Sequence, residues 1–192
     1  MLERLMLPDT HAISIILKDH DKVKGLFERW EEAESSAARE KLITEAVTEL
    51  KIHAVIEEEL FYPAVRNHVG NDVMNEADEE HHVARVLIAE LDATGRENDH
   101  RDAKFKVLAE SVRHHINEEE NEVLPKAKEL KIDFEALGRQ ILDRKKELKQ
   151  AGIPADAEHA MVRKAHGRAD TPASAAHTRK SGTKTGRARV AH

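Results

Sequence analysis

The chain repeats one pattern of histidine, glutamate and proline at two places. His53–Pro63 aligns without gaps with His115–Pro125: the histidine, the glutamates at the fourth and fifth following positions, and the proline at the tenth all coincide. The stretches that follow His20 and His81 also match, with apolar residues opposite apolar residues over the next three helical turns. The lone histidine precedes the repeated segment by 33 residues in the first case and by 34 in the second. The repeat therefore predicts two helical hairpins of the same design.

Apolar residues recur at helical spacing along most of the chain. This predicts an all-α fold: an up-and-down antiparallel four-helix bundle over residues 1–132, with an extra C-terminal helix over residues 133–150. We expect the first helix to start at Asp9 or Thr10, directly after Pro8. Further boundaries are expected at Ser35 or Ser36, Gly70–Asp72, Thr94–Gly95 and Asp99, and at Pro63 and Pro125, which kink or end their helices.

Residues 151–192 differ in composition from the rest of the chain. They hold eight Lys and Arg against three Asp and Glu, whereas residues 1–150 hold 23 against 34. With almost no large apolar side chains, this segment cannot offset its ordering entropy, so we expect a disordered basic tail. Nucleic acid is expected to bind only nonspecifically, through this tail. No leader segment and no membrane-length apolar run is present, which predicts a cytoplasmic protein without membrane contact.

The sequence has 13 histidines and no cysteine, which excludes disulfides, thiolate zinc sites and iron–sulfur clusters. His and Glu four residues apart lie on one helix face, so the repeated segments can turn two imidazoles and two carboxylates toward one point. Lone histidines on the other two helices would complete a site for two first-row metal ions, with the glutamates as bridges. The expected ligands are His20, His53, Glu57, His81, His115 and Glu119. The alternative is a metal-free bundle with hydrogen-bonded histidines, which would be costly to bury in this number.

Neighbouring residues are assigned other roles. Glu58 and Glu120 either orient imidazoles or remain solvated charges. His82 and His114 flank the expected ligands and point about 100° away from them, so we expect them at the surface or behind the ligands. Tyr62, beside Pro63, either packs in the core, which we favour, or lies near the site.

At these residues the chain resembles the hemerythrin-like family of HHE cation-binding proteins. The resemblance spans about residues 10–130, in the segments LKDH, HAVIEEELFYP, EEHHVARVLIAEL and HHINEEENEVLP. It implies a non-haem di-iron centre, with about two iron ions per chain, oxo-bridged and held by the six residues above; manganese and zinc also suit these donors. Oxygen-carrying members have a further histidine four positions before the one at His81. Ala77 stands there, so the resemblance disfavours reversible oxygen carriage, and Asp78 and His82 are candidates for an additional ligand.

Two functions are consistent with such a centre. The first is a metal-binding protein that handles oxygen, peroxide, nitric oxide or iron in a stress response, with a small diatomic molecule or peroxide at open metal positions. The second is a non-enzymatic iron or redox sensor, in which metal occupancy sets the stability of the bundle and a protein partner responds to it. Whether the protein is an enzyme stays open at this point.

Overall fold

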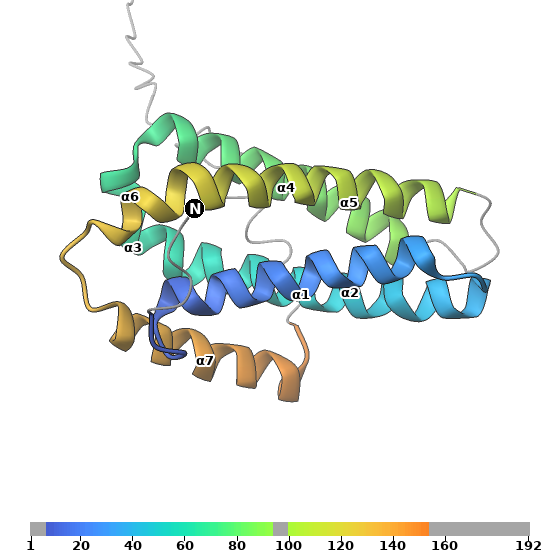
Figure 1. Ribbon diagram of the computed structural model, residues 1–192, viewed down its shortest axis with the longest axis horizontal. Coiled ribbons are helices and arrows are strands. Elements are labelled where there is room, and N and C mark those ends of the chain that lie inside the picture. The colour runs from blue at the N-terminus through green and yellow to red at the C-terminus, as the bar shows by residue number, and fades with distance from the viewer. Residues whose placement is uncertain (1–6, 94–99, 154–192) are drawn as a thin grey trace, which may run out of the picture.

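The computed structural model describes residues 7–93 and 100–153. Long helical rods run antiparallel, which confirms the expected all-α bundle with an additional C-terminal helix (Figure 1). The elements are α1 Ala12–Glu32, α2 Ser36–Ile56, η1 Glu57–Phe61, α3 Tyr62–Val69, α4 Asn71–Ala93, α5 Arg101–Glu118, η2 Glu119–Val123, α6 Leu124–Lys128 and α7 Phe134–Ala151. None of the described helices is long and apolar enough to cross a lipid bilayer. From residue 154 onward, the expected disordered tail lies outside the described residues.

The helix ends follow local capping chemistry. The Ser35 hydroxyl accepts the backbone N–H of Ala38 at 3.2 Å and starts α2, as expected. The first helix begins later than expected, because a turn closed by the His11 N–H and the Pro8 carbonyl at 2.9 Å precedes it. Gly70 ends α3 with φ 117°, a backbone conformation that glycine adopts without strain.

A π-helical turn lies within each rod that carries a repeated segment. Tyr62 donates its backbone N–H to the carbonyl of Glu57, five residues back, and Leu124 donates in the same way to Glu119. A proline stands two positions after the last residue of each turn, Pro63 in the first rod and Pro125 in the second. Proline has no N–H, and its ring crowds the carbonyl four residues before it, so a wider turn just ahead relieves both problems. Of the two expectations for these prolines, a kink or a helix end, the helix end is wrong, because α3 and α6 continue past them.

Two apolar clusters fill the bundle, one toward each end. One contains Phe27, Trp30 and Phe105 among its buried side chains, and the other contains Ile13, Ile16 and their neighbours together with residues of α7. His20 lies in α1 between the stretches that contribute to the two clusters, so a buried polar layer separates them.

The C-terminal helix α7 packs against α1 and α2, on the side away from α4 and α5 (Figure 1). Its closest approach is at Gly138, where an added Cβ would lie 1.8 Å from the backbone oxygen of Thr10. The ring of His11 stacks on Phe134 at 4.9 Å in the same area. Only a residue without a side chain fits at Gly138, so this glycine sets how closely α7 docks.

Candidate metal centre

The structure gathers all six expected ligand residues in the buried layer between the two apolar clusters. Four helices contribute one histidine each, and each π-helical turn begins with one of the glutamates. The exposed fractions are 0% for His20 and Glu57, 1% for Glu119, and 6% for His53, His81 and His115. Burial of this many ionisable groups needs a compensating partner for their charge.

One half of the cluster combines the first hairpin with a glutamate of the second. The Nε2 atom of His20 lies 3.1 Å from Oε2 of Glu119, and Nε2 of His53 lies 3.1 Å from Oε1 of Glu57. One ligand atom from each of these four residues lies within 4.8 Å of the other three. Two imidazoles and two carboxylates can therefore bind one metal ion here.

The other half lies against it. Nε2 of His81 is 3.1 Å from Nε2 of His115, and 3.4 Å from Oε2 of Glu57. Glu57 thus turns one carboxylate oxygen to each half, which is the arrangement of a bridging ligand. Oε2 of Glu119 is 4.0 Å from Nε2 of His115, so the second carboxylate also lies between the halves.

Tyr62 lies beside the cluster, the less favoured of the two positions considered for it from the sequence. Its hydroxyl lies 3.3 Å from Nε2 of His81 and 3.5 Å from Nε2 of His115, with the ring fully buried. Burial and the negative charges of the nearby glutamates, Glu119 first, raise the pKa of Tyr62 well above its usual value, so the phenol stays protonated. The repeat places Leu124 at the equivalent position of the second rod, so the hydroxyl has no counterpart there.

Every histidine of the cluster has a carboxylate on its outer nitrogen. The pairs are Nδ1 of His20 with Glu120 at 3.1 Å, of His53 with Asp19 at 3.5 Å, of His81 with Glu58 at 2.8 Å and of His115 with Glu80 at 2.8 Å. A neutral imidazole that donates its Nδ1–H outward presents the lone pair of Nε2 inward. This arrangement orients metal-binding histidines and makes them better ligands.

Cationic side chains hold three of these outer carboxylates. Lys24 binds Glu120 at 3.0 Å, Arg85 pairs with Glu58, and Lys145 of α7 pairs with Asp19. Lys24 and Arg85 occupy equivalent positions of the repeat, four residues after the histidines of their helices. Asp19 is therefore the carboxylate whose cation comes from outside the repeated hairpins.

The charges of the cluster favour a bound cation. Burial works against protonation of His53, but Glu57 and Asp19 outweigh it and raise the pKa of His53 to about 10. In the same way Glu57 and Glu58 raise the pKa of His81 to about 9 against its burial. The carboxyl of Glu57 has a pKa well below its usual value, because His53 and His81 outweigh the effect of its burial. The cluster thus attracts positive charge, as protons or as metal ions.

A family model described as the hemerythrin HHE cation-binding domain matches residues 11–127, which include all six ligand candidates. The chain belongs to this family. The matched residues of the HHE domain end before α7, so Lys145 lies outside them.

The HHE protein covers very different shares of two similar proteins. A solved structure from Mycobacterium kansasii, titled a hemerythrin HHE cation binding domain-containing protein and Rv2633c homolog, is 25% identical, with a TM-score of 0.62. The match covers 78% of the HHE protein and 98% of that chain. A protein named DNA nickase from Nostoc sp. strain PCC 7120 is 26% identical over 113 residues, which are 59% of the HHE protein but 32% of the nickase. The HHE protein thus spans about a third of that curated relative.

The residues next to the expected ligands have other contacts. Asp78 pairs with Arg66 at 2.6 Å, and neither Asp78 nor His82 belongs to the two halves of the cluster. His114 is 63% exposed and pairs with Glu118 at 3.1 Å. Glu58 and Glu120 orient imidazoles, which decides between the two roles considered for them.

Sequence reasoning missed Asp19 and Glu80, and it ranked core packing above the site for Tyr62. The first two carried a readable signal, because an acidic residue directly precedes the lone histidine in both hairpins. In each hairpin one acid precedes the lone histidine, and a second acid, Glu58 or Glu120, follows the glutamate of the repeated segment. In the structure each of these four acids pairs with a histidine on another helix.

Proposed function

We propose that the protein binds two iron ions in this cluster and uses them to handle oxygen, peroxide or nitric oxide in a stress response. Six atoms carry the proposal: Nε2 of His20 and of His53, and both carboxylate oxygens of Glu57 and of Glu119. All are buried, and among the residues that the structure describes none has a partner with hydrogen-bond geometry. Buried polar atoms are rarely left unpaired, and a metal ion would satisfy all six.

The donor set supports iron. Imidazole with carboxylate suits iron and also manganese and zinc, whereas a chain without cysteine offers no thiolate for softer metals. His20, His53, Glu57 and Glu119 would hold one ion, and His81 and His115 with the shared Glu57 the other. A redox-active pair of ions would supply electron transfer to a small oxygen or nitrogen species.

The chain's own residues prepare the cluster for such a ligand. Carboxylates hydrogen-bonded to Nδ1 of His20, His81 and His115 fix the orientation of these imidazoles, and Asp19 lies 3.5 Å from Nδ1 of His53. The Tyr62 hydroxyl, beside His81 and His115, can donate a hydrogen bond to a small molecule bound on that side. The apolar clusters shield the layer from solvent at both ends of the bundle.

Metal analysis of the full chain produced with iron tests the proposal. We expect about two iron ions per chain and near-ultraviolet absorption from the ferric pair. His81→Ala should lower the iron content, whereas the matched variant His82→Ala should not, because His82 lies outside both halves of the cluster. Equal iron content in the two variants would contradict the assignment of the site.

Reactivity separates the first function from the sensor. Turnover of hydrogen peroxide or consumption of nitric oxide by the iron-loaded chain supports the first, whereas stoichiometric iron without turnover supports a sensor. We carry no DNA-directed activity over from the nickase, because the similarity covers 32% of that protein.

A further inference from the structure

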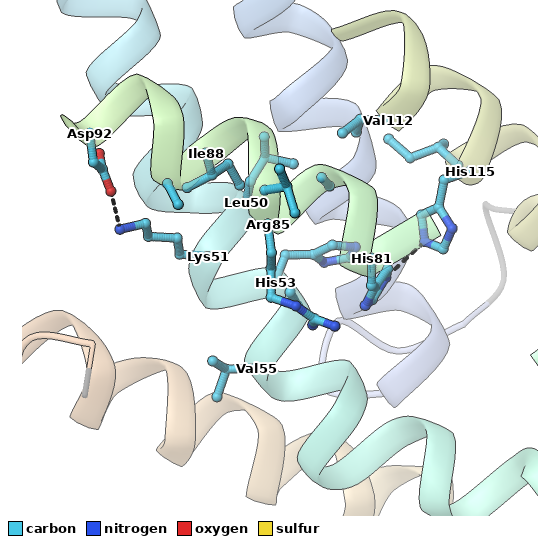
Figure 2. Close-up of a pocket in the computed structure, with 15 residues that line it drawn as sticks. Leu50, Lys51, His53, Val55, His81, Arg85, Ile88, Asp92, Val112 and His115 are labelled. Atoms are coloured by element: carbon cyan, nitrogen blue, oxygen red, sulfur yellow. Dashed lines mark hydrogen bonds and ion pairs between the residues drawn. The ribbon is translucent and has the colours of Figure 1, made fainter. Parts of the chain in front are cut away.

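A cavity of about 230 Å³ lies between α2, α4 and α5 and reaches the candidate metal centre. His53, His81 and His115 line one part of it, and Leu50, Ile88 and Val112 line the middle. In Figure 2 the pair Lys51–Asp92 stands on the side opposite His81 and His115. The Asp92 side chain, which also lines the cavity, is 51% exposed, so this side meets solvent.

The charged side chains around the cavity are paired. Lys51 binds Asp92 at 2.6 Å, and the guanidinium of Arg85 pairs with Glu58. Their charges are thus largely compensated, and most of the remaining lining is aliphatic. A charged ligand would lose hydration here without a comparable replacement, whereas a neutral apolar one would not.

The repeat shows that this space is particular to one side of the bundle. The two hairpins are equivalent, so the gap between α2 and α4 corresponds to the gap between α5 and α1. Ala84 corresponds to Val23, and Ile88 corresponds to Phe27. Phe27 is fully buried, and the guanidinium of Arg113 lies over its ring at 5.4 Å. Smaller side chains on α4 therefore leave open the space that larger side chains of α1 fill.

The ion pair at the edge of the cavity has an equivalent in the other gap between the hairpins, although the side chains that line the two gaps differ in size. Lys51–Asp92 corresponds in the repeat to Arg113–Glu31, which also pair, at 2.8 Å. The same type of ion pair thus ties the helices on both sides, so the cavity does not come from a missing link between α2 and α4.

We propose that this cavity binds a small, neutral, apolar organic molecule beside the metal ions. Its volume exceeds the roughly 150 Å³ of an apolar protein cavity known to hold benzene, so a single aromatic ring or a short alkyl chain fits. With three of the four histidines in its wall, the cavity would bring such a molecule next to the metal positions. The inference rests on the proposed function for its role as a co-substrate site, but binding itself needs no metal.

Fluorine NMR with 4-fluorotoluene tests the proposal on the full chain, with 4-fluorobenzoate and 4-fluorobenzylammonium as charged probes of similar size. We expect the neutral probe to bind at least about tenfold more tightly than either charged one, because the cavity offers no unpaired counter-charge. Tighter binding of the benzoate, or no binding of 4-fluorotoluene, would overturn the proposal. The cavity would then serve only as a passage for gases.

Ala84→Leu fills the cavity and should weaken 4-fluorotoluene by about tenfold or more. The matched control is Ala103→Leu on the exposed surface of α5, which should leave binding unchanged. If Ala84→Leu does not fold, Ala89→Leu gives a second test, since Ala89 also lines the cavity and is exposed. Equal affinities in the filled and control variants would contradict the assignment of the site.

Metal loading locates the probe and separates the two proposals. With Mn²⁺ bound, the fluorine signal of 4-fluorotoluene should broaden strongly, and with Zn²⁺ bound it should stay sharp. If the chain binds neither metal but still binds 4-fluorotoluene in a manner that Ala84→Leu removes, the proposed function fails and the cavity remains a binding site. If both metals bind and 4-fluorotoluene does not, only the cavity proposal fails.

Discussion

The two halves of the His/Glu cluster are built from the same repeat but lie in different surroundings. In both, one histidine comes from a helix that precedes the repeated segment and the other from that segment, and carboxylates face all four Nδ1 atoms. Beyond these shared contacts the halves diverge. The His20–His53 half touches α7 through Asp19 and Lys145, whereas the His81–His115 half has the Tyr62 hydroxyl and supplies two of the three histidines that line the cavity.

This difference indicates that the two halves have different roles. In the proposed centre the repeated segments would supply ligands for two ions, and residues without a counterpart in the repeat would make the two positions inequivalent. A buried half supported by a lysine is suited to hold its ion firmly. A half beside a hydroxyl donor and an apolar cavity is suited to bind a small molecule.

The largest effect is expected where the halves meet. Glu57 turns one oxygen to each half, so Glu57→Ala should lower the metal content from about two ions per chain to below one. Glu119 approaches His20 at 3.1 Å but His115 only at 4.0 Å, so Glu119→Ala should weaken the His20 half first. Metal analysis of both variants measures this. If Glu57→Ala keeps two ions, Glu57 is not a bridge.

The next effect concerns the docking of α7, which supports one half only. Gly138→Ala places a Cβ against the Thr10 backbone, and we expect the free energy of unfolding to fall by about 1–3 kcal/mol. Gly25→Ala is the matched control: it also adds a Cβ to a helical glycine, but nothing lies within 4 Å of it, so it should stabilise the protein by up to about 1 kcal/mol. Denaturant unfolding measures both. Equal effects would mean that the contact of α7 with Thr10 is unimportant.

The fold and the convergence of the ligands could be predicted because helical periodicity fixes which way a side chain points from its own helix. His20 and His81 were identified by aligning two helices on their apolar residues, and both lie in the buried layer. That these residues bind metal stays a prediction.

The asymmetry could not be predicted, because it depends on which helices meet. Glu58 supports His81 of the other hairpin, a pairing that no spacing within one helix reveals. Tyr62 reaches the cluster from the rod that the π-helical turn reshapes, and Lys145 reaches Asp19 only because α7 docks closely at Gly138. Backbone geometry between elements decides these contacts, and single-sequence patterns carry little information about it.

A smaller effect is expected from the lysine that α7 supplies. Lys145→Met removes the cation from Asp19, which faces His53, and should weaken metal binding in that half by about tenfold, the lower end for outer contacts of a metal ligand. The measurement is a metal titration in a His115→Ala background, where the His20–His53 half remains. Lys146→Met, an exposed neighbour on the same helix, is the control. An unchanged affinity would show that α7 does not tune this half.

The smallest effect is expected from the Tyr62 hydroxyl, which lies beside the His81–His115 half. Tyr62→Phe removes the hydroxyl beside Nε2 of His81 and of His115 while keeping the ring. The hydroxyl can hydrogen-bond to these nitrogens only while no metal occupies them, so the loss of a hydrogen bond of about 1 kcal/mol should strengthen metal binding roughly fivefold. We expect this change in a His20→Ala background, where the His81–His115 half remains, and none in the His115→Ala background. Lys145→Met should act in the His115→Ala background only. If both variants change the affinity of the same half, the two halves are not independently tuned, and the assignment of separate roles is wrong.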